Sequence, residues 1–189
     1  MKKLIFFLLT FFSLVTVHAQ MVVMREMSMA GGNSANSAAL NMSSQKNIIE
    51  NLGSSGGYTS LVMAIQSADL IELLQKEGPY TFFAPSNESF TKFMQADIGS
   101  TDDDKKKLSY LIKSHIVSGK FDVDALTKMI KEADGPVSLT SLSGEVLQVT
   151  KKGKKIIVTD AKGKQSTVVT SNLEQSNGVI HIIDKVLTQ

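Results

Sequence analysis

The sequence predicts an α+β fold in which helices gather before a mostly antiparallel sheet. Apolar residues recur at helical spacing between residues 61 and 130, whereas beyond residue 145 they alternate with polar residues. Turn-forming residues separate the alternating segments, and an Asn177-Gly178 turn precedes the last of them. Helical periodicity followed by strand periodicity is typical of an α+β domain.

Two short helices are expected before residue 80. The apolar face of the first comprises Leu61, Ile65 and Ala68. Asp69 and Glu72 have the spacing at which two side chains cap the next helix reciprocally. Gly78-Pro79 is expected to end that helix.

A longer helix is predicted to start at Thr101. Asp102–Asp104 lie at its N-terminus, the positive end of the helix dipole, and Lys105–Lys107 follow one turn later. This pattern indicates a solvent-exposed helix start, whose acidic residues interact favourably with the dipole, rather than a ligand site. Its apolar face comprises Leu108, Leu111, Ile112 and His115. Asp122 is expected to cap a third helix, which Gly135-Pro136 ends. The inward residues of the third helix are Val123, Leu126 and Ile130.

A strand and a helix are predicted to meet within Thr81–Phe90. The first three residues are apolar or β-branched, and Pro85 biases the residue before it away from helical angles. Ser86 can then cap a helix whose first turn holds Glu88.

Four strands are predicted in the last third of the chain. They are Glu145–Thr150, Lys155–Thr159, Gln165–Thr170 and Val179–Asp184. Turns around residues 152–154 and 161–164 join the first three. The last strand is apolar on both faces, which predicts that it is buried on both sides.

Three segments resemble the fasciclin-like family, in that family's order. Residues 81–90 read TFFAPSNESF, residues 111–120 LIKSHIVSGK and residues 177–187 NGVIHIIDKVL. Family members typically read close to TVFAPTNEAF, LLKYHIVPGK and NGVIHVIDKVL. The resemblance covers residues 46–189 and implies a wedge-shaped β-sandwich or β-barrel with helices packed along one side. It also implies a non-enzymatic adhesion domain.

The chain is expected to have three parts. Residues 1–19 contain two lysines, an apolar stretch and a small-residue cleavage site, as in an export signal. Residues 20–45 are rich in Met, Gly, Ser and Asn and are interpreted as a flexible tether, and residues 46–189 as a single fasciclin-like domain. The apolar stretch is too short for a comfortable membrane span, although an uncleaved anchor is the alternative. We expect a secreted, periplasmic or cell-surface protein of bacterial origin.

Composition argues against several kinds of protein. Without cysteine, the chain has neither disulfides nor a lipoprotein attachment residue. Removal of the two signal lysines leaves 18 basic residues against 18 acidic residues. A nucleic-acid-binding protein needs a basic face to neutralise phosphates, so nucleic acid is not an expected partner.

Catalysis is not expected. Only His115 and His181 remain after signal removal, and each lies on an apolar face. A hydrogen-bonded core histidine is the simpler interpretation of both, and a metal ligand or general base is the alternative. No serine or carboxylate has the spacing of a nucleophile elbow or a hydrolytic pair. We expect no catalytic residue, cofactor or metal.

Animal fasciclin-like domains suggest two segments as partner-binding sites. A Tyr-His pair implicated in integrin-dependent adhesion corresponds here to Ser114-His115. An Asp-Ile pair before the last strand corresponds to Asn172-Leu173, whose amide cannot supply an anionic ligand to a receptor's metal. Integrin recognition is therefore not expected. The two segments are candidate contacts for another cell-surface or matrix protein or for a polysaccharide.

Six lysines surround the predicted hairpin turns. They are Lys151, Lys152, Lys154, Lys155, Lys162 and Lys164, and we call them the lysine rim. Lysines at turns and edges commonly prevent strands from associating. The alternative is a binding site for an acidic polysaccharide or another surface anion, to which Lys152 and Lys154 would contribute.

The predicted tether has a high density of methionine. Its residues include Met21, Met24, Met27 and Met29. Thioethers are soft ligands that favour Cu(I), so a small-ligand or Cu(I)-binding protein is the alternative to adhesion. An apolar spacer is the simpler interpretation, because no histidine or cysteine assists the methionines after processing.

Replacing the four methionines with leucine tests the copper hypothesis. If they bind Cu(I), the mature protein will compete with a weak Cu(I) chelator in a titration, and the leucine variant will not. Absence of competition by the unmodified protein would end the hypothesis.

Overall fold

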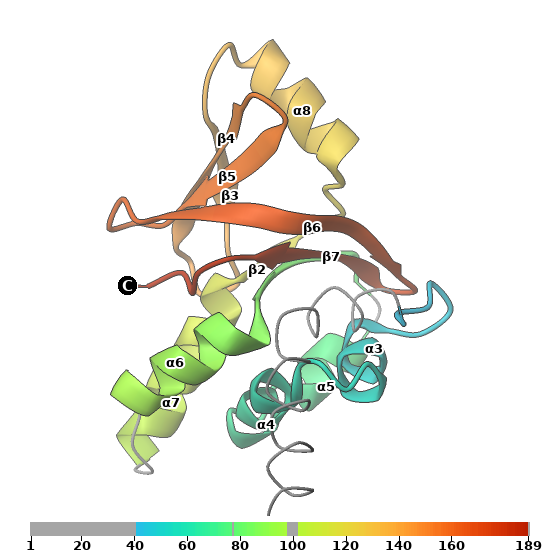
Figure 1. Ribbon diagram of the computed structural model, residues 1–189, viewed down its shortest axis with the longest axis vertical. Coiled ribbons are helices and arrows are strands. Elements are labelled where there is room, and N and C mark those ends of the chain that lie inside the picture. The colour runs from blue at the N-terminus through green and yellow to red at the C-terminus, as the bar shows by residue number, and fades with distance from the viewer. Residues whose placement is uncertain (1–40, 77, 98–101, 189) are drawn as a thin grey trace, which may run out of the picture. The chain divides into compact units, whose positions relative to one another are not determined.

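Six helices and seven strands are present in the computed structural model, which describes residues 41–76, 78–97 and 102–188 (Figure 1). The helices are α3 (Ile48–Ser54), α4 (Thr59–Ser67), α5 (Ile71–Gln75), α6 (Asn87–Asp97), α7 (Asp102–Ser114) and α8 (Val123–Glu132). The strands are β1 (Tyr80–Pro85), β2 (Ile116–Ser118), β3 (Val137–Thr140), β4 (Val146–Lys152), β5 (Lys155–Thr159), β6 (Gln165–Gln175) and β7 (Gly178–Ile183). Among the described residues, no helix has the length and apolar character needed to cross a bilayer.

The strands form one sheet in the order β2-β1-β7-β6-β5-β4-β3. Of the described neighbours, only β1 and β7 run parallel. A bridge between Val117 and Ser141 joins the two ends of the sheet, and the Leu142 N–H donates to the Ile116 carbonyl at 2.7 Å. The sheet is therefore a nearly closed barrel with helices alongside, which confirms the predicted α+β class (Figure 1).

Two apolar cores lie on opposite faces of β1 and β7. The core shared with helices α3 to α7 includes Phe82, Ala84, Ile180 and Ile182. The core inside the barrel includes Phe83 and Ile183, and Leu126 of α8 packs into it. All six residues of β7 are buried, as its two-sided apolar pattern predicted. Side chains that alternate along these two strands therefore hold the helices and the barrel together.

Side chains cap three of the helices. The Ser86 hydroxyl at the start of α6 and the Asp122 carboxylate at the start of α8 each accept from the N–H three residues later, at 3.3 and 2.7 Å. Both caps were predicted. Asn47 and Glu50 form a capping box at the start of α3, a helix that sequence analysis left unassigned.

The predicted cap at Asp69 is wrong. Asp69 has a left-handed φ of 54° and lies in the turn that ends α4. An N-cap residue needs extended backbone angles, so Asp69 cannot take that role. Leu70 stands before α5 without a side-chain cap, and the Asp69 carboxylate instead pairs with Lys105 of α7.

The sequence periodicity did not predict two short strands, and it predicted a third strand that is too short. β2 and β3 have three and four residues, which is too short for alternation to show. β6 continues to Gln175 instead of ending at Thr170, because register shifts between Val168 and Leu173 interrupt its alternation. The predicted start of α7 at Thr101 lies outside the described residues.

Asn177 joins three segments of the chain. Its Oδ1 accepts from the Ile48 N–H at 2.9 Å, at the start of α3. Its Nδ2 donates to the carbonyls of Leu74 and Lys76 at 2.8 and 3.0 Å. The next residue, Gly178, lies so close to β1 that a Cβ would stand 2.1 Å from a carbonyl oxygen. The predicted Asn-Gly turn therefore also links α3, the end of α5 and β1, and we call this link the joint.

An Asn177→Asp variant tests this joint. It removes both donated hydrogen bonds and places a carboxylate against two carbonyls, so the free energy of unfolding should fall by about 2 to 4 kcal/mol in urea denaturation. Ser176→Ala, at the exposed neighbour, is the control and should change it by less than about 0.5 kcal/mol. Equal stability of the two variants would show that the joint is unimportant.

Candidate functional site

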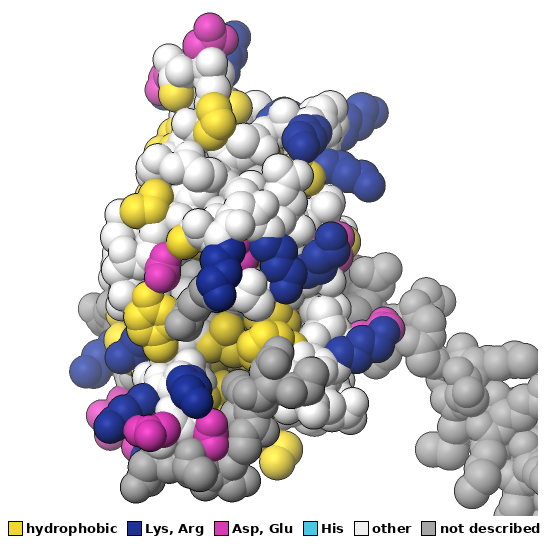
Figure 2. Space-filling view, turned by 90° about the vertical axis from the view of Figure 1, so that its left-hand side faces the viewer, with side chains coloured by type: hydrophobic (Ala, Val, Ile, Leu, Met, Phe, Trp, Pro, Cys, Tyr) yellow, Lys and Arg dark blue, Asp and Glu magenta, His cyan; other side chains and the backbone are white. Residues whose placement is uncertain are grey.

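The lysine rim lies at the two ends of β5, and its six lysines are exposed. Lys152 and Lys155 are direct cross-strand partners, an arrangement in which like charges destabilise a sheet. Among the described residues, none of the six rim lysines forms an ion pair. Figure 2 shows several lysines over the upper and middle parts of one face, whereas lysines and acidic side chains are mixed at its lower end. The rim is therefore a surface of positive charge that no ion pair with a described residue neutralises.

A buried carboxylate shapes the second rim turn. Asp160 is 5% exposed, and its Oδ1 accepts from the backbone N–H groups of Lys162 and Lys164 at 3.1 and 2.8 Å. Its Oδ2 accepts from the N–H of Thr188 at 2.8 Å. Charge-assisted bonds to a fixed carboxylate hold the turn in one conformation. The two lysines are thus presented on a rigid support.

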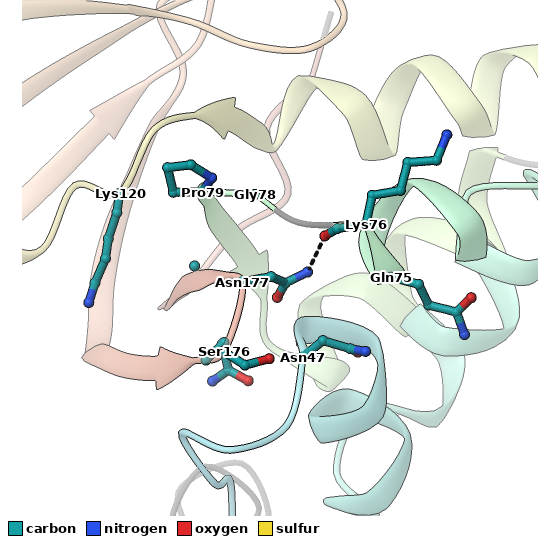
Figure 3. Close-up of a pocket in the computed structure, with 10 residues that line it drawn as sticks. Asn47, Gln75, Lys76, Gly78, Pro79, Lys120, Ser176 and Asn177 are labelled. Carbon is teal, nitrogen blue, oxygen red and sulfur yellow. Dashed lines mark hydrogen bonds between the residues drawn. The ribbon is translucent and has the colours of Figure 1, made fainter.

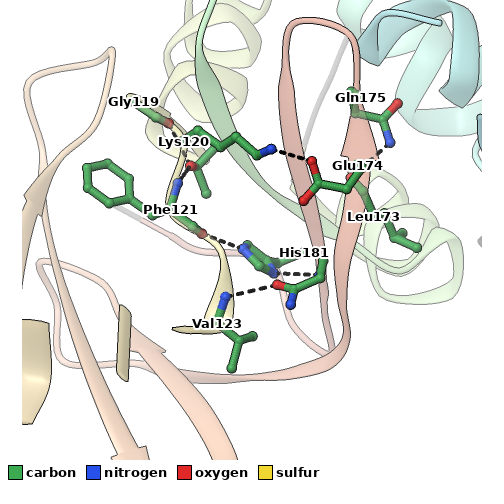
Figure 4. A network of polar contacts seen from close by, with 10 residues as sticks. Gly119, Lys120, Phe121, Val123, Leu173, Glu174, Gln175 and His181 are labelled. Carbon is green, nitrogen blue, oxygen red and sulfur yellow. Dashed lines mark hydrogen bonds and ion pairs between the residues drawn. The ribbon is translucent and has the colours of Figure 1, made fainter. Parts of the chain in front are cut away.

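The second predicted segment supports the start of α8 (Figure 4). Asn172 has a left-handed φ of 59°, and its Oδ1 accepts from the Val123 N–H at 2.9 Å. Its own N–H donates to Nδ1 of His181 at 3.3 Å. Asn172 is exposed and Leu173 is half-buried against the helical core. Much of the hydrogen-bonding capacity of Asn172 is therefore used within the fold.

Both described histidines are buried and hydrogen-bonded through both ring nitrogens. In His115, Nδ1 pairs with the Leu111 carbonyl at 2.7 Å and Nε2 accepts from the Leu187 N–H at 2.9 Å. In His181, which stacks on Phe83, Nε2 pairs with the Phe121 carbonyl at 2.8 Å. This is the arrangement expected of core histidines. Neither ring has a free nitrogen for proton transfer or metal binding.

Burial also keeps both imidazoles neutral. It lowers the pKa of His115 from 6.5 to about 4, against an opposing effect of the Leu111 carbonyl. Burial likewise lowers the pKa of His181. Ser114 and His115 are 4% and 2% exposed, so a partner at this segment would have to contact their neighbours. Among the described residues, no three His, Asp or Glu side chains are placed to hold a metal ion.

A polar pocket of about 540 Å³ lies where β1 and β7 begin (Figure 3). Its lining comprises Asn47, Gln75, Lys76, Gly78, Pro79, Lys120, Gln175, Ser176, Asn177 and Gly178. In Figure 3, Lys120 and Lys76 stand on either side of Asn177. Sequence analysis did not predict this pocket. Gly78-Pro79 was recognised only as the end of a helix and Asn177-Gly178 only as a turn, and the parallel pairing of β1 with β7 brings the two segments together.

The predicted site residues do not form one site. Lys152 and Lys154 share a hairpin turn, whereas Ser114-His115 and Asn172-Leu173 hydrogen-bond to different elements. The methionines of the copper hypothesis, the export signal and most of the tether lie outside the described residues. Those expectations remain predictions.

Comparisons with known proteins identify the family. Residues 56–189 match the model of the Fasciclin domain, so the chain belongs to the fasciclin family. It is 34% identical to Protein sll1483 of Synechocystis sp., over 74% of this chain and 72% of that protein. It is also 34% identical to the transforming growth factor-beta-induced protein ig-h3 of Sus scrofa, over 69% of this chain but 17% of that protein.

A solved structure has the same fold. The FAS1 domain pair from the insect cell adhesion molecule Fasciclin I matches with a TM-score of 0.61 at 18% identity, over 76% of this chain and 51% of that chain. The chain therefore spans about half of that domain pair, and the likeness concerns the fold alone. Fasciclin domains are common in adhesion proteins and are generally non-enzymatic and extracellular.

The buried state of His115 predicts a pH dependence of stability. Between pH 6.5 and about 4 the unfolded chain binds a proton at His115 that the folded chain does not, so the free energy of unfolding falls as pH falls. The contribution of this histidine is about 3 kcal/mol at pH 4. Urea denaturation from pH 7 to 4 measures it.

His115→Gln is the control for this experiment, because an amide retains a donor and an acceptor but does not titrate in this range. The variant should lose less stability between pH 7 and 4 than the unmodified protein. Equal losses in the two proteins would contradict the assignment of the effect to His115.

Proposed function

We propose that this protein is an exported, non-catalytic adhesion module that binds an acidic polysaccharide of a cell surface or matrix through the lysine rim. The observation on which the proposal rests is the cluster of six exposed lysines, none of them in an ion pair with a described residue. A charged surface that stays uncompensated within its own fold is available to an anionic partner.

Protection of strand edges accounts for part of the rim. β3 pairs with β4 only as far as Val149, and β6 pairs with β5 only from Ile157. Lys151, Lys152 and Lys155 therefore lie where each strand has a single partner, at free edges of the kind that lysine commonly protects. Edge protection does not require two lysines to face each other, however, and the opposition of Lys152 and Lys155 carries an electrostatic cost. Binding of a polyanion would convert this repulsion into attraction.

The dimensions of the rim suit an extended polymer. The five residues of β5 separate the two turns by on the order of 16 Å. Several weak contacts spread over this length would add up along one chain, which favours a polymer over an isolated anion. Rigid support of Lys162 and Lys164 by Asp160 would reduce the entropy lost on binding. The interaction should be strongly salt-dependent.

The remaining predictions fit an extracytoplasmic module. Residues 1–19 would direct export, and residues 20–45 would form a flexible tether before the domain. A cell-surface or matrix protein is a further class of partner for such a module. Integrin is not expected among these partners, since Asn172 supplies no anionic ligand and its amide oxygen is already bonded to the start of α8.

Charge reversal at Lys152 and Lys154 tests the proposal. Retention of the mature protein on a polygalacturonate column should be lost in the Lys152→Glu/Lys154→Glu variant, and also for the unmodified protein in moderate salt. The fold should tolerate the change, because glutamate at position 152 would face Lys155 across the strands.

Lys46→Glu/Lys131→Glu is a control with the same change in net charge, at exposed lysines outside the rim. This control should keep most of the retention. If the two double variants lost retention equally, the binding would reflect net charge, and the rim would not be the site.

A further inference from the structure

Several polar side chains that line the pocket at the start of β1 and β7 have no hydrogen-bond or ion-pair partner among the described residues. The side chains of Gln75 and Ser176 make no hydrogen bond with a described residue, and Lys76 forms no ion pair with one. Asn47 uses Oδ1 to cap α3, and its Nδ2 has no described partner. The pocket is therefore rich in free donors.

The pocket floor, in contrast, is fixed. Asn177 is 8% exposed, and both its amide oxygen and its amide nitrogen form the hydrogen bonds of the joint described above. Gln175 is 6% exposed, and its Nε2 donates to the Leu173 carbonyl at 3.0 Å. A hydrogen-bonded floor below exposed polar side chains is an arrangement suited to a preformed binding site.

The charged side chains found in the lining are both lysines, Lys76 and Lys120. No acidic side chain of a described residue lines the pocket, and Glu77 lies outside the described residues. Lys120 forms an ion pair with Glu174, which is not a lining residue, and this ion pair holds the Lys120 side chain at the edge of the pocket (Figure 4). Lys76 is exposed, so its flexible ammonium is available to a ligand.

A phosphate group fits this pocket poorly. Phosphate sites in proteins commonly use rows of free backbone N–H groups. Here the N–H groups of Ile48 and Glu50 already donate to Asn177 and Asn47. The described residues leave one ammonium without an ion pair, neutral amide and hydroxyl groups, and the exposed ring of Pro79. These groups suit a ligand with one carboxylate, several hydroxyls and an apolar C–H face.

We propose that this pocket binds a uronic acid, the carboxylated form of a monosaccharide. The carboxylate would pair with Lys76, the hydroxyls would bond to Gln75, Asn47 and Ser176, and the sugar ring would lie against Pro79. A volume of about 540 Å³ accommodates one or two sugar units. The site lies at the far end of β6 from Lys162 and Lys164 and does not depend on the lysine rim.

Amide chemical shifts of the ¹⁵N-labelled protein, followed during titration with sodium glucuronate, test the proposal. Saturable shifts are expected at Lys76, Ser176 and their neighbours. Glucose has no carboxylate and should bind at least about tenfold more weakly. A galacturonate trimer distinguishes a free uronate ligand from the end of a polymer, because a pocket that receives a chain end binds the trimer at least as well as the monomer.

Three variants complete the test. Lys76→Gln should weaken glucuronate binding about tenfold, whereas Lys131→Gln, at an exposed lysine of α8, should leave it unchanged. Lys152→Glu/Lys154→Glu should also leave it unchanged, which separates the pocket from the rim. Shifts confined to the rim, equal binding of glucose, or an unaffected Lys76→Gln variant would each overturn the proposal.

Discussion

Burial of β1 and β7 on both faces is the constraint on which the rest of the structure depends. The two strands run in parallel through the middle of the sheet, and their alternating side chains supply one core to the helices and another to the barrel. Each fully buried Phe or Ile along them stabilises the fold by about 1.5 to 3 kcal/mol. Neither core is complete without these strands, so the helical and barrel parts depend on one another.

This constraint determines how polar groups inside the molecule are used. Backbone groups that the sheet and helices leave unpaired must find partners within the interior. His115 and His181 serve this purpose, since each bonds through both nitrogens to backbone groups. His115 thereby links the end of α7 to Leu187, and His181 links β6 to Phe121. Asn177 does the same for three segments at the start of β7. Side chains that might have suggested chemistry are thus structural, and surface side chains remain for binding.

The two candidate binding surfaces differ in their physical basis. The lysine rim consists of hairpin residues whose charges are adjacent in sequence, so the sequence alone was enough to find it. What the structure added is that Lys152 and Lys155 face each other across the β4–β5 hairpin, an opposition that edge protection does not require. The pocket combines residues from the ends of α5, β2 and β6 and from the start of α3. No spacing along the chain indicates that Lys76 and Lys120 line the same cavity.

The sequence by itself determined the features that depend on a few neighbouring residues. The strand ended by Pro85, the caps at Ser86 and Asp122, and the two-sided burial of β7 all follow from local sterics, hydrogen bonding and periodicity. Only the tertiary structure decided the parallel pairing of β1 with β7, the closure of the barrel, and the turn at Asp69 that removed its predicted cap. Those features depend on contacts between distant segments, whose free energies are settled only when the whole chain packs together.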